Sequence, residues 1–149
     1  MLSACPQGLY PPGVYTPKDE LVELCKVVAE YGGVYASHIR NESHDVLNAV
    51  SEAIDIGRQA GTPVIISHHK VAGKKNWGKS VETLELIDRA NREGIEVSLD
   101  QYPYKAGSSL LSATIPPEFH EGGTEKLVER LKDTDIRTRI KDIILDPER

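Results

Sequence analysis

Two stretches of the chain read almost alike: Gly32-Gly-Val-Tyr-Ala-Ser-His38 and Gly61-Thr-Pro-Val-Ile-Ile-Ser-His68. Each has a glycine, then a short apolar run, then the dipeptide Ser-His. Apolar runs of about four to eight residues bounded by glycine or proline are typical of buried strands. The repeat therefore predicts two buried strands, each with a histidine where it ends.

Amphipathic segments separate these strands. Helix starts are predicted at Thr16, Ser43 and Ser80, because each side chain can cap a first helical turn. Pro17 stands where a helix tolerates proline best, and Gly61 is predicted to close the second helix in a left-handed conformation. Apolar residues recur at helical spacing behind each start.

The alternation of helix and strand predicts an α/β fold. Three strands are expected at 34–37, 63–67 and 95–99, followed by a helical tail with helices at 124–131 and 135–145. Helices long enough to cross back over a sheet predict βα units with parallel strands and right-handed crossovers. An open doubly wound sheet and a closed (β/α)8 TIM-type barrel both use this unit. Three strands would be about three-eighths of such a barrel.

Composition narrows the possible partners. The 149 residues carry a formal net charge of −5, which argues against nucleic acid or an anionic membrane as a partner. No apolar run approaches the roughly 18 residues of a membrane helix, and the N-terminus does not resemble a signal peptide. Cys5 and Cys25 form no metal-type pair, and Cys25 is expected to be a buried thiol. A reducing, cytoplasmic setting is the expectation.

The strand-end histidines predict a metal site. Functional side chains of βα proteins gather at the carboxyl ends of the strands, and neighbouring parallel strands lie about 4.8 Å apart. We expect His38 and His68 at equal heights on adjacent strands, where both could bind one zinc ion. The alternative is that each is a core histidine with a backbone partner.

Other side chains near these strand ends are candidates for supporting roles. His69 is expected to point to the opposite face, as a structural residue or as one that supports a metal ligand, and Asp100 is expected to orient a ligating imidazole. Arg40 and Lys70 each follow a histidine by two residues and could bind a substrate carboxylate or be loop charges.

The segment after the third strand could contact substrate. Tyr102 and Tyr104 have hydroxyls that can orient it, and Ser108 could help to hold an anion; the alternative is a packed strand end followed by a turn. The strands are followed by no phosphate-binding glycine motif and no Gly-x-Ser-x-Gly elbow, so serine nucleophile chemistry is not indicated.

Several motifs together resemble the N-acyl-D-amino-acid deacylases (D-aminoacylases) of the amidohydrolase superfamily. The resemblance runs almost continuously from residue 8 to about residue 109. The motifs are Gly8-Leu-Tyr-Pro-Pro-Gly-Val-Tyr15, Tyr35-Ala-Ser-His-Ile-Arg-Asn-Glu42, Glu52-Ala-Ile-Asp-Ile-Gly-Arg-Gln-Ala-Gly-Thr-Pro-Val-Ile-Ile-Ser-His-His-Lys70, Asn76-Trp-Gly-Lys79 and Asp100-Gln-Tyr-Pro-Tyr-Lys-Ala-Gly-Ser108.

The resemblance implies a metal-dependent (β/α)8 barrel that hydrolyses N-acyl-D-amino acids to a D-amino acid and a carboxylate. It implies that His38 and His68, at the ends of the fifth and sixth barrel strands, are zinc ligands. It also implies that Lys70, Tyr102 and Ser108 bind the substrate. In the family, zinc lowers the pKa of a bound water to about 7 and polarises the amide carbonyl.

Other family features have no counterpart in the sequence. It contains no His-x-His pair, neither cysteine matches the family's bridging ligand, and the catalytic aspartate is expected outside the chain. We therefore expect residues 1–109 to be a partial barrel, from the exit of strand four through strand seven. Residues 110–149 are expected to form a helical insertion or tail, and the chain alone is expected to be inactive.

Two other functions stay open from the sequence. One is a cyclic-amide hydrolase of the same superfamily, similar to hydantoinases or dihydroorotases. The other is a non-catalytic truncated half-barrel that pairs with another chain. Open edge strands expose unpaired backbone groups, so self-association through them is a further expectation.

Overall fold

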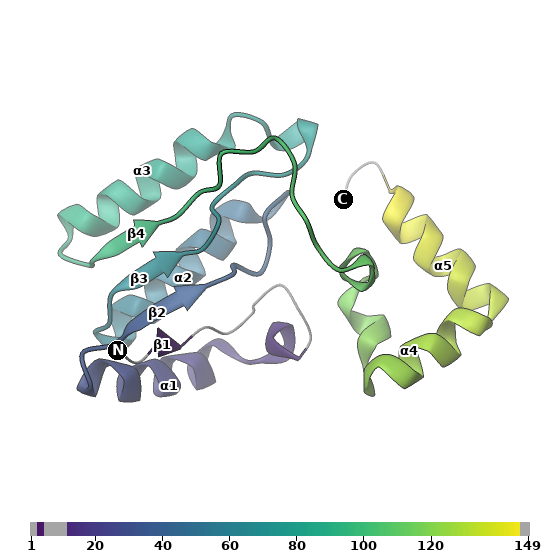
Figure 1. Cartoon of the computed structure of the whole chain (residues 1–149). Coiled ribbons are helices and arrows are strands. Elements are labelled where there is room, and N and C mark those ends of the chain that lie inside the picture. The colour runs from purple at the N-terminus through teal and green to yellow at the C-terminus, as the bar shows by residue number, and fades with distance from the viewer. Residues whose placement is uncertain (1–2, 5–11, 147–149) are drawn as a thin grey trace. The chain divides into compact units, whose positions relative to one another are not determined.

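The computed structural model describes residues 3–4 and 12–146 and divides the chain into two units, residues 1–103 and 104–149. The first unit alternates strands with helices (Figure 1). Its elements are β1 (Ser3–Ala4), α1 (Lys18–Glu30), β2 (Val34–Ser37), α2 (Val46–Ala60), β3 (Val64–Ile66), α3 (Lys79–Arg92) and β4 (Val97–Leu99), with short 3-10 turns η1 (Gly13–Tyr15) and η2 (Lys74–Asn76).

The four strands form one parallel sheet in the order β1-β2-β3-β4. A doubly wound sheet would reverse its strand order at a switch point, whereas here each strand adds beside the one before it. Sequential order with helical crossovers is the pattern of a barrel segment. The predicted α/β class and parallel βα units are confirmed, and the two-residue strand β1 is an addition that the sequence pattern did not reveal.

The main core lies between the sheet and its helices. Along β2 and β3, Tyr35, Ser37, Val64 and Ile66 are buried, whereas the residues that alternate with them are partly exposed. The buried strand residues join apolar side chains of α1, α2 and α3 in one cluster. The helices therefore cover one face of the sheet, and the other face remains accessible in this unit.

Three predicted helix caps are wrong. The N-cap of α1 is the extended Pro17 and not Thr16, and the helix begins at Lys18. Ser43 lies in a turn before α2, where its backbone N–H donates to the Asn41 side chain over 2.8 Å. Ser80 falls inside α3, because Gly78 makes the preceding turn with φ of 98°. In each case a local turn with its own hydrogen bonds or glycine sets the helix start.

Other local predictions are confirmed. Gly61 ends α2 with φ of 69°, in the left-handed region where glycine is favoured. Cys25 is a buried free thiol on α1, and burial raises its pKa to about 11. Cys5 lies outside the described residues.

The second unit is helical, as predicted. It contains the 3-10 turns η3 (Leu111–Thr114) and η4 (Pro117–His120) and the helices α4 (Gly123–Lys132) and α5 (Thr134–Leu145). Phe119, Leu127 and Ile140 form its small core. Asp133 caps α5 by accepting hydrogen bonds from two backbone N–H groups of its first turn. Across both described units, no helix combines the length and apolar character needed to span a membrane.

Candidate metal centre

The two predicted ligands meet beyond the ends of β2 and β3. The Nδ1 atom of His38 contacts the Nε2 atom of His68, and the ring centroids lie 4.4 Å apart. Burial, followed by the nearby His68 ring, holds the pKa of His38 below its ordinary value of 6.5. His38 is therefore mainly neutral at pH 7, which is the form that can donate a lone pair to a metal.

The histidines reach each other from unequal positions. In the β2–β3 register Ser37 pairs with Ile66, so His68 lies one residue further along its strand than His38 does. The expectation of equal heights is therefore wrong. His68 compensates with φ of 41°, in the left-handed region, and is the only described non-glycine residue with positive φ. This turn interrupts the strand's alternation and brings the ring of His68 to His38.

Asp100 stabilises this turn through the main chain. Its carboxylate Oδ1 accepts a 2.6 Å hydrogen bond from the backbone N–H of His68, and its carbonyl accepts one of 2.9 Å from the backbone N–H of His69. Asp100 thus lies at the site, as predicted, but it contacts the backbone of His68. The carboxylate beside the imidazole belongs to another residue.

That carboxylate is Glu42, which the sequence analysis did not select. Its Oε1 atom lies 3.1 Å from His68 Nδ1 and accepts a 2.6 Å hydrogen bond from Lys70 Nζ. Lys70 Nζ also lies 2.8 Å from His68 Nδ1 and 5.6 Å from the ring centroid of Tyr102. The structure therefore groups Lys70 and Tyr102 with the histidines. The sequence signal for Glu42 was its position four residues after His38, in the loop that leaves β2.

The outcomes for two other predicted residues differ. His69 is buried, and its Nε2 atom is 2.9 Å from Thr83 Oγ1 on α3, so it has the structural role that was expected. Ser108 is exposed and belongs to the second unit. Its predicted role in substrate binding stays a prediction.

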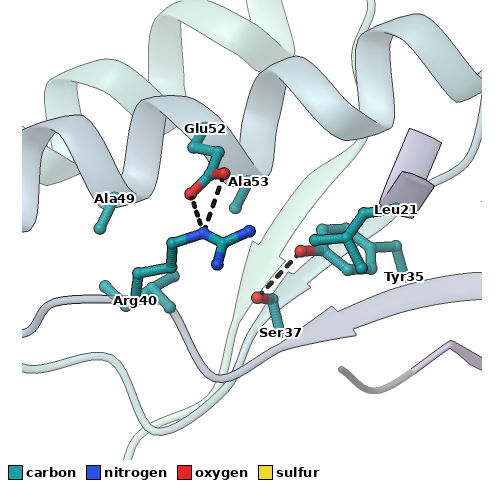
Figure 2. Close-up of a pocket in the computed structure, with 8 residues that line it drawn as sticks. Leu21, Tyr35, Ser37, Arg40, Ala49, Glu52 and Ala53 are labelled. Carbon is teal, nitrogen blue, oxygen red and sulfur yellow. Dashed lines mark hydrogen bonds and ion pairs between the residues drawn. The ribbon is translucent and has the colours of Figure 1, made fainter. Parts of the chain in front are cut away.

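Arg40 has a structural role on the side of β2 that the helices cover (Figure 2). Its Nε atom donates to both carboxylate oxygens of Glu52 on α2, over 3.0 and 2.8 Å. Its two terminal nitrogens donate to the carbonyls of Val14 and Thr16, over 2.8 and 2.6 Å. Arg40 therefore fastens the segment before α1 to α2, and its donors are engaged away from the histidines.

The donors at the strand ends fit part of a zinc site. Imidazole nitrogens are ordinary zinc ligands, and ligating histidines usually have a carboxylate or carbonyl on the other ring nitrogen, as His68 has in Glu42. A catalytic zinc site needs about three protein ligands. Within residues 3–4 and 12–146, no group of three or more His, Cys, Asp or Glu side chains is placed to bind a metal. His38 and His68 are thus two donors of an incomplete set.

Comparison with known proteins relates the chain to a family. The D-aminoacylase of Alcaligenes xylosoxydans xylosoxydans is 46% identical over 104 residues, which are 70% of this chain and 21% of that enzyme. The chain is a homologue of the D-aminoacylases. Because it spans about a fifth of their length, the homology concerns one part of those enzymes. A scan against protein-family models finds no match.

Solved structures agree with the fold. A D-aminoacylase crystal structure that defines a subset of amidohydrolases matches with a TM-score of 0.64 and 47% identity, covering 67% of this chain and 21% of that one. An N-acyl-D-glutamate deacylase from Bordetella bronchiseptica, complexed with zinc and a phosphonate mimic of the tetrahedral intermediate, matches with a TM-score of 0.68 and 43% identity over 77% of this chain and 23% of that one. The βα units therefore correspond to part of the D-aminoacylase barrel.

Proposed function

We propose that this chain supplies part of the active site of a zinc-dependent amidohydrolase that converts N-acyl-D-amino acids to D-amino acids and carboxylates. The observation that carries the proposal is the meeting of His38 and His68 beyond two adjacent parallel strands, with Lys70 and Tyr102 beside them. The homology to D-aminoacylases supports the substrate class.

In this proposal His38 and His68 hold zinc, which when bound activates water and polarises the amide carbonyl. His38 would use Nδ1 and His68 would use Nε2, because these atoms face each other. The ammonium of Lys70 would attract the substrate carboxylate, and the hydroxyl of Tyr102 would orient the substrate. Ser108 is also proposed to bind the substrate, as the family resemblance implies.

A chimera tests the proposal. The homologous segment of the Alcaligenes D-aminoacylase is replaced by the matching residues of this chain, and hydrolysis of an N-acetyl-D-amino acid is measured. We expect zinc-dependent hydrolysis that a His68→Ala substitution abolishes. A folded, zinc-binding chimera that opens hydantoin or dihydropyrimidine rings and leaves N-acyl-D-amino acids intact would favour a cyclic-amide hydrolase instead.

The isolated chain provides a complementary measurement. We expect the zinc-loaded, 149-residue chain to hydrolyse no N-acetyl-D-amino acid, because its described residues offer two donors where catalysis needs about three. Turnover by this chain that depends on His38 and His68 would contradict that expectation.

A further inference from the structure

Glu42 joins the two loops that carry the histidines. Its side chain is 13% exposed, and its carboxylate contacts both His68 Nδ1 and Lys70 Nζ, which belong to the segment after β3. Its backbone carbonyl accepts a 2.6 Å hydrogen bond from the N–H of Ala72, in the same segment. Glu42, which lies in the loop after β2, therefore contacts the segment after β3 through both its main chain and its carboxylate.

The contacts of His68 Nδ1 allow two exclusive hydrogen-bond arrangements. A neutral imidazole carries its proton on one nitrogen only. If Nδ1 accepts from Lys70 Nζ, the proton lies on Nε2, the nitrogen that faces His38. If Nδ1 carries the proton, it can donate to Glu42 Oε1, and Nε2 keeps the lone pair that a metal needs.

Resting on the proposed zinc site, we propose that Glu42 is a positioning residue that fixes His68 in the Nδ1–H tautomer and holds the Lys70 ammonium beside it. Glu42 accepts from Lys70 in either arrangement, so Lys70 keeps a partner when the imidazole stops accepting. Binding of a metal at Nε2 would thus release the Lys70 contact with the ring and leave one of its three N–H donors for a substrate carboxylate, since the other two donate to Glu42 and to the His68 carbonyl. The carboxylate of Asp100 instead accepts from the backbone N–H of His68, so Glu42 is the carboxylate that contacts the imidazole.

Zinc affinity of the 149-residue chain tests the proposal. Isothermal titration calorimetry with zinc compares wild type, Glu42→Gln and the charge-matched control Glu23→Gln, which alters an exposed ion pair on α1. Loss of an outer carboxylate typically weakens metal affinity about 10–100-fold. We expect that loss for Glu42→Gln, smaller loss for Glu42→Asp, and wild-type affinity for Glu23→Gln.

Nitrogen NMR of the histidine rings gives a second readout that needs no metal. At fixed pH, the 15N shifts of the His68 ring report which nitrogen carries the proton, and a His68→Ala variant assigns the signals. We expect the Nδ1–H population to fall in Glu42→Gln and to stay unchanged in Glu23→Gln. Circular dichroism of each variant checks that its fold is intact.

The outcomes separate this inference from the proposed function. Zinc binding that needs His38 and His68 but is unaffected by Glu42→Gln would overturn the role of Glu42 and leave the metal site standing. No zinc binding by the wild-type chain would count against the metal site in this chain. In that case the NMR comparison still decides, because an unchanged His68 tautomer in Glu42→Gln would overturn the inference.

Discussion

The two Ser-His strand ends share a sequence pattern and differ in the residues that come next. After His38 comes the buried Ile39, and then Arg40, which binds Glu52 and two backbone carbonyls on the helical side. At the second end, the left-handed turn at His68 is followed by the buried His69 and by Lys70, whose Nζ atom contacts the His68 imidazole. The first end thus combines one candidate metal donor with an arginine that stabilises the fold, whereas the second combines a candidate donor with a cation beside it.

The chemistry of the two cations fits this division. The planar guanidinium of Arg40 offers five N–H donors in a rigid fork, and all three of its nitrogens donate hydrogen bonds within the fold. The ammonium of Lys70 is a compact charge on a flexible chain, which suits it to exchange one partner for another. The same position in a repeat therefore serves stability at one strand and is proposed to serve binding at the next.

The largest expected effect is the loss of stability when Arg40 is replaced, and it tests the difference between the two strand ends. Arg40 and Glu52 are each 24% exposed, and removal of one partner of a largely buried pair is strongly destabilising. We expect Arg40→Met to lower the free energy of unfolding by about 3 kcal/mol, measured by urea denaturation. Lys70→Met should cost less, about 1 kcal/mol, because Glu42 keeps its contact with His68, whereas loss of Arg40 also removes the hydrogen bonds to Val14 and Thr16. Equal losses at both positions would contradict the division of roles.

Zinc affinity should depend on both strand ends equally. A structural zinc site is worth about 10–16 kcal/mol over four ligands, so one ligand contributes about 3 kcal/mol, or roughly 100-fold in affinity. We expect about that loss from either His38→Ala or His68→Ala, measured by competition with a chromophoric chelator. The buried His69 serves as the control through His69→Gln, which should leave affinity within about threefold.

Alkaline pH should lower the stability of the fold through Cys25, the buried thiol on α1. Burial raises the pKa of Cys25 from 9.0 to about 11, so the unfolded chain loses this proton before the folded chain does. The stabilisation is complete below pH 9 and is lost as pH rises toward 11. We expect a decrease of about 2 kcal/mol across that interval, and a smaller decrease in Cys25→Ala, from urea titrations at each pH.

The smallest expected effect concerns the backbone at the two histidines. Glycine adopts positive φ without strain, whereas in extended backbone it costs conformational entropy. We therefore expect His68→Gly to be more stable than His38→Gly by about 1 kcal/mol, measured by thermal unfolding in the absence of metal. A glycine that is equally costly at both positions would mean that the left-handed turn carries no strain.

The sequence predicted those parts of the fold that depend on local patterns. Apolar runs identified β2, β3 and β4, helical spacing identified the five α-helices, and the repeated Ser-His located the candidate ligands. Hydrophobic periodicity and glycine positions are properties of neighbouring residues, so a single sequence carries them. Sequential strand order was one of two possibilities, because periodicity does not encode which strand lies beside which.

Features that depend on contacts between distant residues could not be predicted in this way. The one-residue offset between β2 and β3 and the left-handed turn at His68 arise from pairing across the sheet. From the sequence alone, Glu42 is one of several acidic loop residues. Its partners, His68 and Lys70, come from the segment after β3, which lies far from it in the chain. The helix caps failed for a different, local reason, because Asn41 and Gly78 fix turns that compete with Ser43 and Ser80.

The segment after β3 also bears the single tryptophan of the chain, Trp77, whose side chain is 72% exposed. Because that indole already contacts water, its emission should change little when the core unfolds. It should instead respond to events in its own segment, which Glu42 ties to the histidines through Ala72. The chain thus contains an intrinsic fluorescent reporter in the segment that carries His68, while global unfolding is better followed through the helical signal in far-ultraviolet circular dichroism.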